Sequence, residues 1–248
     1  MVVGMESFRE KFKDFSDCYT IIGGAACDIL MSEVDLSFRA TKDIDMILIL
    51  EDRNQEFASV FWEYIKEGEY RCGWKNSEEM HFYRFTEPKE GYPVQIELFS
   101  KMPGYHLPVQ EGIIPIHIDE DVSSLSAILL NDDFYHFMME GRKVVNDIGI
   151  LDAEHIIPFK MYAWLDLRRK KLNGEHVNEK DLKKHKNDVF RLLQIVPLGT
   201  VVKSKGLVRE CIEQFLEEIK SEELRLVTMG LPFEKDEAIG LLREVYEG

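Results

Sequence analysis

The chain has 248 residues, of which 45% are apolar and 31% charged, and its formal net charge is −15. This apolar content is enough for a buried core, and the length suits one large domain or two small ones. No segment approaches the roughly 18 uninterrupted apolar residues of a membrane span, and the negative charge argues against broad, non-specific binding to nucleic acid.

The cysteines are scattered and form no C-x-x-C pair, so the sequence predicts neither a zinc site nor a disulfide framework. The N-terminal segment becomes charged within a few residues, which is unlike a secretory signal. Together these features favour a reduced, cytoplasmic protein. The four cysteines are Cys18, Cys27, Cys72 and Cys211.

The first half of the chain mixes helix and strand patterns. The apolar run at 44–50 is typical of a strand that is covered on both faces. Gly23 and Gly24 separate a predicted strand from a predicted helix. In chain order, we expect a helix over 6–15, a strand over 19–22, a helix over 25–33, a strand over 44–50, a helix over 54–67 capped by Asn54, strands over 80–86 and 92–99, and a short strand over 113–118.

The second half is predicted to be helical. Asp152 and Asn178 are suited to cap two of its helices, and Gly174 follows the end of the first. The predicted helices cover 124–140, 153–172, 179–195, 204–220 and 234–246. The sequence therefore predicts an α+β fold, with a mixed sheet and flanking helices over 1–121 and a helical domain over 122–248.

Asp43 and Asp45 open the predicted central strand. Residues two apart on a strand share a face, so the two carboxylates point the same way while Ile44 points the other. Like charges at the mouth of a buried strand repel each other, and a divalent cation such as magnesium relieves that repulsion. The alternative is that Asp43 only opens the strand and Asp45 is solvated at its edge.

Two further features have a structural and a functional interpretation. Glu97 lies between Ile96 and Leu98, with Phe99 on its own face, which favours a covered face where the carboxylate needs a partner, although a lone strand glutamate usually faces water. Gly23-Gly24 before a helix allows phosphate to approach the backbone, or it is an ordinary strand-to-helix turn.

Taken together, strand, Gly-Gly, helix, Arg39-x-Thr41-x-Asp43-x-Asp45 and a later acid-bearing strand resemble the nucleotidyltransferase superfamily of the DNA polymerase β type. Within it, residues 18–50 resemble most the AbiEii/AbiGii toxin-type nucleotidyltransferases. The pattern of that family is matched at Gly23, Gly24, Arg39, Thr41, Asp43 and Asp45.

The resemblance implies an enzyme that transfers a nucleoside monophosphate from an NTP to an acceptor hydroxyl. It implies two magnesium ions held by Asp43, Asp45 and Glu97, with Gly23 and Gly24 facing the β- and γ-phosphates. It also implies that the helical half closes over the nucleotide and acceptor, and that an antitoxin protein is a possible partner. The acceptor is open between tRNA, protein and a small molecule.

The helical half offers more candidate residues. Lys160 falls on the apolar stripe of its helix, so it either snorkels or has a partner; the resemblance implies contact with the triphosphate. In the family the next helix often carries K-D-x-x-D, where this chain has Lys184-His185-x-x-Asp188. Asp188 is therefore a nucleotide-binding candidate, and the role of His185 is open. Arg168 lies two turns beyond Lys160 and is a further candidate.

The stretch from Arg168 to Lys186 is rich in basic residues. It is either a solvated helix face or a wall that faces phosphate.

Other functions stay open at this point. A small-molecule adenylyltransferase of the aminoglycoside type shares the same core motifs, and an acidic protein suits a cationic acceptor. A second alternative is a non-catalytic module of the same fold that binds a nucleotide or a partner protein. The retention of all three acids argues against this alternative. The last alternative is an α/β domain that binds no nucleotide.

Overall fold

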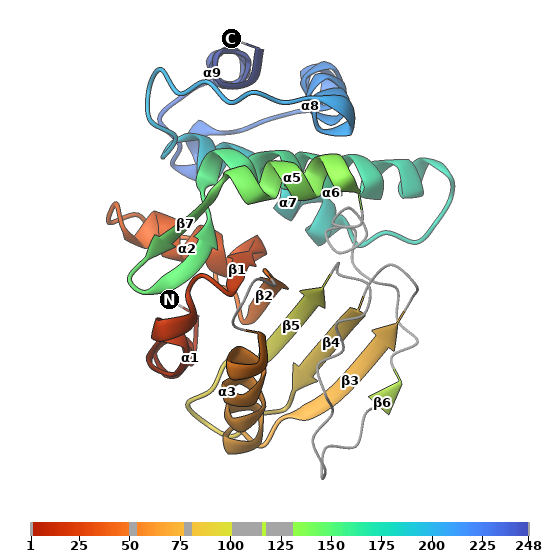
Figure 1. The fold of residues 1–248 in the computed structure, drawn as a ribbon. Helices are drawn as coiled ribbons and strands as arrows, with labels where there is room; N and C mark the ends of the chain where they lie inside the picture. The colour runs from red at the N-terminus through yellow and green to blue at the C-terminus, as the bar shows by residue number, and fades with distance from the viewer. Residues whose placement is uncertain (1, 50–53, 77–80, 101–115, 118–130, 248) are drawn as a thin grey trace. The chain divides into compact units, whose positions relative to one another are not determined.

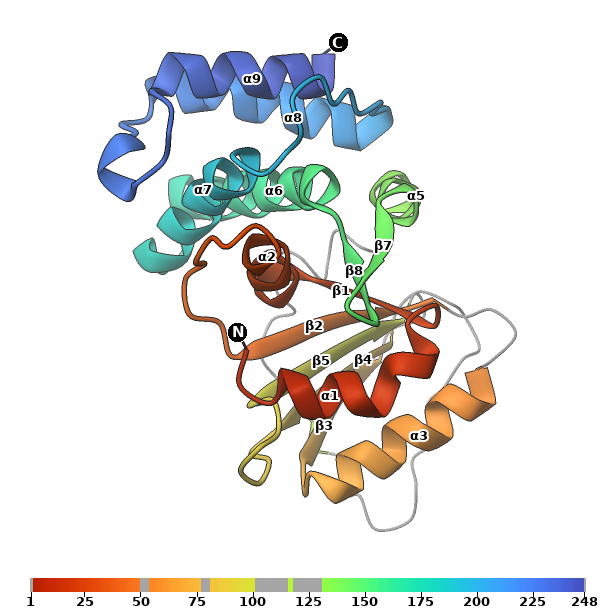
Figure 2. The ribbon, with the colours of Figure 1, turned by 90° about the vertical axis from the view of Figure 1, so that its left-hand side faces the viewer.

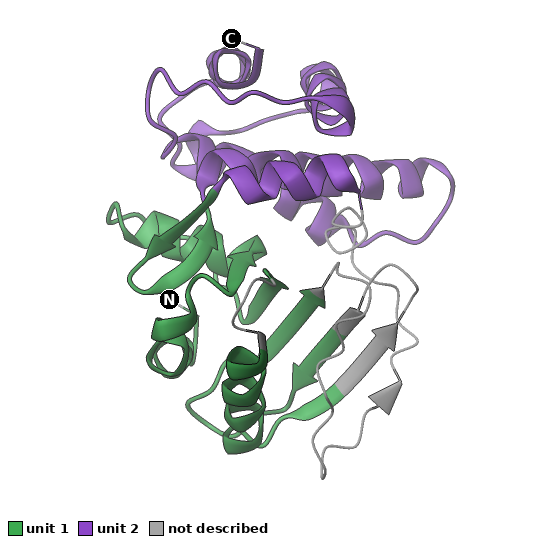
Figure 3. Ribbon diagram, viewed as in Figure 1, with its two compact units in different colours: residues 1–121, 142–151 green, residues 122–141, 152–248 purple. Residues whose placement is uncertain are grey.

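A computed structural model of the chain describes residues 2–49, 54–76, 81–100, 116–117 and 131–247 (Figure 1). The chain forms two compact units, which are not two consecutive stretches of sequence. Unit 1 contains residues 1–121 and 142–151, and unit 2 contains residues 122–141 and 152–248 (Figure 3). Each unit is described by itself below.

Unit 1 is built on a mixed sheet with the strand order β6-β3-β4-β5-β2-β1-β8-β7 among the described residues. β2 lies between two neighbours, because it pairs antiparallel with β1 and parallel with β5. The strands are β1 Tyr19–Ile22, β2 Asp43–Leu48, β3 Arg71–Asn76, β4 His81–Thr86, β5 Gln95–Ser100, β6 Ile116–His117, β7 Arg142–Val145 and β8 Ile148–Leu151.

Aromatic side chains of two helices of unit 1 pack together next to the sheet. In α1 (Met5–Phe12), the ring of Phe12 lies 5.7 Å from that of Phe57 and 6.3 Å from that of Tyr19 on β1. Phe57 belongs to α3 (Asn54–Glu67), which lies beside α1 (Figure 2). Phe12 and Phe57 are fully or almost fully buried, so both contribute to the apolar surface that this unit removes from water.

The third helix of unit 1 follows β1 without a loop. α2 (Gly23–Ser32) begins at Gly23, directly after Ile22, and its residues from Gly23 to Met31 are all buried. Gly23 has φ +68°, a conformation that glycine adopts without steric cost, so the chain turns from strand to helix within one residue. This abrupt turn fixes the start of α2 at the end of β1.

Unit 2 is helical in its described part. α6 packs against both α7 and α8. The side chain of Asp152 accepts a hydrogen bond from the His155 N–H at 2.8 Å, and that of Asn178 accepts one from the Lys180 N–H at 3.0 Å, as the sequence predicted. The helices are α5 Asp132–Glu140, α6 Ala153–Leu172, α7 Glu179–Leu193, α8 Gly206–Glu218 and α9 Lys235–Glu247.

The predicted α+β class, with a mixed sheet followed by a largely helical half, is confirmed. Three strands were not predicted: β3, and the hairpin of β7 and β8 that returns the chain to unit 1. The hairpin turns at Asn146 and Asp147, whose φ values are +48° and +65°, so its turn chemistry was present in the sequence. Residues 124–130 of one predicted helix, residues 113–115 and 118 of a predicted strand, and the side chain of Asn54 lie outside the described residues.

Within the described residues, no helix combines the length and the apolar character needed to cross a membrane.

Pro158 sits inside α6, where it leaves one backbone carbonyl without its helical donor. Proline has no N–H, so the carbonyl of Glu154, four residues earlier, receives no bond from position 158. The hydroxyl of Tyr246 on α9 donates to that carbonyl at 2.6 Å. A C-terminal helix thus completes the hydrogen bonding of α6.

Removing this hydroxyl with Tyr246→Phe is expected to lower the free energy of unfolding by about 1 kcal/mol, because it leaves a partly buried carbonyl unsatisfied. Urea denaturation measures the change. The same substitution in a Pro158→Ala background is expected to cost clearly less, because the restored N–H supplies the missing donor. Equal costs in the two backgrounds would show that Tyr246 acts through packing alone.

Candidate active site

The register of two parallel strands brings the predicted acids together in unit 1. Asp45 on β2 pairs with Glu97 on β5, and Asp43 pairs with Gln95. Laterally paired residues of a sheet point to the same face, so Asp43, Asp45 and Glu97 share one face. Asp43 and Asp45 are partly exposed, whereas Glu97 is buried.

The Gly23-Gly24 turn lies directly against this acid cluster. Ile22 pairs with Asp45 across β1 and β2, which places the next residue, Gly23, beside the Asp45 side chain. A Cβ added to Gly23 would lie 2.1 Å from Asp45 Oδ2. No side chain larger than hydrogen fits there while Asp45 keeps its position.

The second glycine is covered by the residues that precede β2. A Cβ on Gly24 would lie 2.6 Å from Thr41 Oγ1 and 3.6 Å from Arg39 Nη2. The guanidinium of Arg39 also lies over the ring of Phe38, 5.0 Å from its centroid. The alternating residues of the Arg39-x-Thr41-x-Asp43-x-Asp45 run therefore line the turn and the acid cluster together.

The pKa of the Glu97 carboxyl is shifted by opposing effects of its surroundings. Burial raises the pKa of its carboxyl, and the charge of Asp43 raises it further, while the neighbouring Arg84 and a hydrogen bond with Asp45 lower it. The net shift is upward, because removing a carboxylate from water outweighs its favourable contacts. The three acids therefore interact electrostatically, and a cation among them would relieve the cost of their charges.

Two residues at this site were missed by the sequence analysis. Arg84 on β4 donates from Nε to Glu97 Oε1 at 2.8 Å, and Gln95 donates from Nε2 to the same oxygen at 2.9 Å. Gln95 was visible on the Glu97 face of its strand. Arg84 depends on the β4–β5 register, in which it pairs with Glu97, and no pattern within β4 alone reveals that register.

The donor set is compatible with magnesium, which prefers one or two carboxylates together with substrate phosphates. All candidate ligands here are carboxylate oxygens. Within the described residues, no group of three or more His, Cys, Asp or Glu side chains could hold a metal ion, so Asp43, Asp45 and Glu97 do not form such a group by themselves. A cation at this position would need further oxygen ligands, such as those of a substrate phosphate.

The candidates from the helical half belong to unit 2, where Lys160 and Asp188 pair with each other. Lys160 Nζ lies 3.5 Å from Asp188 Oδ2, and the two side chains are 1% and 0% exposed. Arg191 Nη1 approaches the other oxygen of Asp188 at 3.3 Å. His185 is buried on the same helix. Lys160 thus has a buried partner rather than snorkelling to water, and its contact with a triphosphate stays a prediction.

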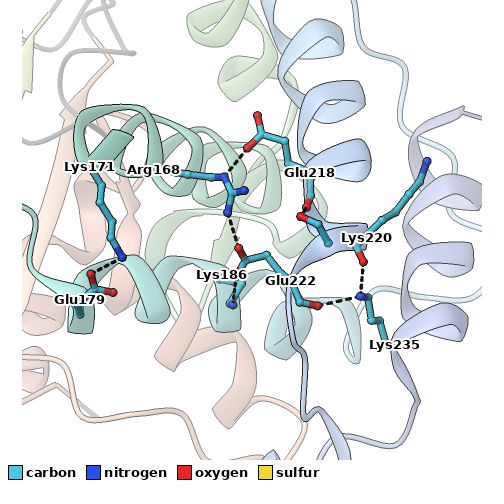
Figure 4. Close-up of polar contacts among 9 residues, drawn as sticks. Arg168, Lys171, Glu179, Lys186, Glu218, Lys220, Glu222 and Lys235 are labelled. Atoms are coloured by element: carbon cyan, nitrogen blue, oxygen red, sulfur yellow. Dashed lines mark hydrogen bonds and ion pairs between the residues drawn. The ribbon is translucent and has the colours of Figure 1, made fainter. Parts of the chain in front are cut away.

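The basic stretch from Arg168 to Lys186 forms part of a cavity of about 880 Å³ in unit 2. Arg168 contacts Glu218 and Glu222, and Lys186 lies 2.7 Å from Glu222 (Figure 4). The interpretation as a solvated, ion-paired helix face therefore fits these residues better than a bare phosphate-facing wall. The cavity is lined by basic residues at 168, 171, 183, 186 and 225 and by acidic residues at 179, 222 and 223.

Comparison with known proteins gives distant structural similarity only. No protein-family model matches the chain, and no curated protein matches its sequence. The chain is similar to an antigenic nucleotidyltransferase-like protein from Paracoccidioides brasiliensis, with 13% identity, a TM-score of 0.46, and coverage of 98% of this chain and 91% of that one.

Two other solved structures are more distant. A candidate nucleotidyltransferase from H. pylori shows 12% identity and a TM-score of 0.34 over 96% of this chain and 89% of that one. A cytoplasmic RNA terminal U-transferase shows 12% identity and a TM-score of 0.27 over 76% of this chain and 42% of that one. All three TM-scores are below 0.5.

Gly23→Ala is expected to cost clearly more stability than Gly91→Ala. Both glycines have positive φ, +68° and +92°, so both substitutions carry a conformational cost of about 1–2 kcal/mol. Only Gly23 also meets Asp45, whereas a Cβ at Gly91 meets no described atom within 4 Å. Urea denaturation gives the difference. It should shrink in an Asp45→Ala background, and a difference that persists there would mean that Asp45 is not the obstacle.

Lys160→Met is expected to lower the free energy of unfolding by about 3–5 kcal/mol, because it leaves the carboxylate of Asp188 buried with one cation fewer. Adding Asp188→Asn should recover most of this loss. Lys170→Met on the same helix breaks a more exposed pair with Asp166, with 39% and 17% exposed side chains, and is expected to cost at most about 1 kcal/mol. Similar losses for Lys160→Met and Lys170→Met in chemical denaturation would rule out a structural role for the buried pair.

Proposed function

We propose that the protein is a metal-dependent nucleotidyltransferase that transfers a nucleoside monophosphate from an NTP to an acceptor hydroxyl and releases pyrophosphate. The observation that carries the proposal is the register of β2 and β5, which aligns Asp45 with Glu97 while Gly23 abuts the Asp45 carboxylate. Acids held together next to a tight backbone turn at a helix start are suited to phosphate chemistry that needs a cation.

In this proposal Asp43, Asp45 and Glu97 would hold magnesium when the nucleotide is bound. When bound, the metal would neutralise charge on the phosphate oxygens and favour deprotonation of the acceptor hydroxyl. Glu97 is the candidate to accept that proton. Burial raises the pKa of its carboxyl, and Arg84 opposes this rise.

The Gly23-Gly24 turn is proposed to lie along the β- and γ-phosphates. α2 starts at Gly23 without a side-chain cap on its N-terminus and without an acid in its first turn. The N–H groups of a first helical turn lack helical acceptors, and the helix dipole favours an anion there. Arg39 and Thr41, beside Gly24, are proposed to contact the same phosphates.

The sequence motif and the net charge support different classes of acceptor. The Arg39-x-Thr41-x-Asp43-x-Asp45 run resembles the AbiEii/AbiGii toxin-type enzymes, which supports an RNA or protein acceptor. The net charge of −15 favours instead a small cationic acceptor of the aminoglycoside type. Incubating the protein with each of the four α-labelled NTPs and a total cell extract separates these acceptors, because the label enters RNA, protein or a small molecule.

Asp45→Asn is expected to lower magnesium-dependent NMP transfer by about 10²-fold or more, because it removes charge from a group that stabilises the reacting phosphate. The labelled-NTP assay measures transfer, and circular dichroism with thermal melting checks that the variant stays folded. Asp35→Asn is the matched control, since Asp35 is an exposed residue of unit 1 in a left-handed conformation that asparagine also adopts. Full activity of Asp45→Asn would contradict the proposal.

A further inference from the structure

Arg84 stands at the end of a row of charged side chains across three strands. β4, β5 and β2 are neighbours in the sheet, and the registers align Arg84 with Glu97 and Glu97 with Asp45. Laterally paired residues share a face, so the guanidinium lies on the same face as the acids. Arg84 Nε donates to Glu97 Oε1 at 2.8 Å, with side chains that are 18% and 8% exposed.

Two side chains donate hydrogen bonds to one oxygen of Glu97. Arg84 Nε and Gln95 Nε2 both donate to Oε1. A change of χ1 or χ2 of Glu97 would break both bonds, so the two donors favour its present rotamer. Glu97 is therefore restrained without a cation, and it also hydrogen-bonds with Asp45.

The charges of the row explain why an arginine is needed there. Glu97 is buried and carries neighbouring acids at positions 43 and 45, so its ionised form needs a nearby positive charge. An arginine stays protonated at every physiological pH. The positive charge beside Glu97 is therefore present whether or not a cation is bound. Arg84 thus provides a permanent positive charge within the acid cluster.

We infer that Arg84 is a positioning residue that acts as the resident counter-charge of the acid cluster and thereby keeps the affinity of the site for a free divalent cation low. A divalent cation that binds Asp45 and Glu97 is repelled by the guanidinium. Phosphate oxygens of a bound NTP offset that repulsion, so the cation binds mainly as its complex with the nucleotide. The inference rests on the proposed function, to which it adds the order in which metal and nucleotide are taken up.

The inference is tested with Arg84→Gln, which keeps a hydrogen-bond donor and removes the charge. Arg84→Gln is expected to bind Mn²⁺ about three- to tenfold more tightly than the original protein, because the like charge beside the site is gone. Binding of Mn²⁺ alone is measured from the electron paramagnetic resonance signal of the free ion. In the absence of cation, the melting temperature of Arg84→Gln should fall by several degrees. A residue that only supports the fold would weaken metal binding, never tighten it.

Two variants serve as matched controls. Arg84→Lys keeps the charge and should leave the Mn²⁺ affinity within about twofold of the original value, since an ammonium repels the cation in the same way. Arg71→Gln removes an arginine from β3 that pairs with Glu87 at 3.1 Å, where both side chains are more than 60% exposed, and should change neither affinity nor melting.

An unchanged or weaker Mn²⁺ affinity in Arg84→Gln overturns the inference. If Arg84→Gln does not fold without cation, its folding is titrated with Mn²⁺: recovery by Mn²⁺ and not by KCl of equal ionic strength supports the inference, and no recovery overturns it. The proposed function is judged separately by NMP transfer in the original protein. If the original protein transfers NMP but Arg84→Gln does not bind Mn²⁺ more tightly, only the inference is rejected. If Arg84→Gln binds Mn²⁺ more tightly but the original protein transfers no NMP, only the proposed function is rejected.

Discussion

The parallel pairing of β2 with β5 is the constraint on which the candidate site depends. Asp45 and Glu97 are 52 positions apart in the chain, yet this pairing aligns them on one face of the sheet. A shift of the register by one residue would turn Glu97 to the opposite face and bring Ile96 or Leu98, which are both fully buried, onto the face of the acids. The alternation along β5 therefore disfavours such a shift, because it would exchange the acid with apolar side chains of the core.

The turn at Gly23 depends on the same sheet. Ile22 pairs with Asp45 across β1 and β2, so the end of β1 brings the backbone of Gly23 against the Asp45 carboxylate. The apolar faces of the strands thus set the geometry of the polar groups at their ends. Within unit 1, the same strand arrangement therefore buries the apolar side chains of the sheet and places Gly23 beside Asp45.

Both units contain buried charges that are compensated by charges of opposite sign. In unit 1, Arg84 compensates Glu97, and in unit 2 Lys160 and Arg191 compensate Asp188. Burying an ion without a partner costs several kcal/mol, so each of these acids requires its basic neighbour. The two clusters differ in accessibility: Asp43 and Asp45 keep partial exposure to solvent, whereas Lys160 and Asp188 are sealed from it. This difference makes the cluster of unit 1 the better candidate for chemistry with a bound ligand.

Local sequence patterns determined the elements that carry the site. Apolar runs located β1 and β2, caps at Asp152 and Asn178 located the starts of α6 and α7, and the alternation in Asp43-Ile44-Asp45 predicted that the two carboxylates share a face. These signals are local, because strand periodicity and helix capping act within a few residues. The tertiary structure alone decided that Arg84 faces Glu97, that Gly23 abuts Asp45, that Lys160 pairs with Asp188, and that the β7–β8 hairpin returns to the sheet of unit 1. Such contacts join residues far apart in the chain. Their partners are set by strand register and helix packing, which no short stretch of sequence encodes.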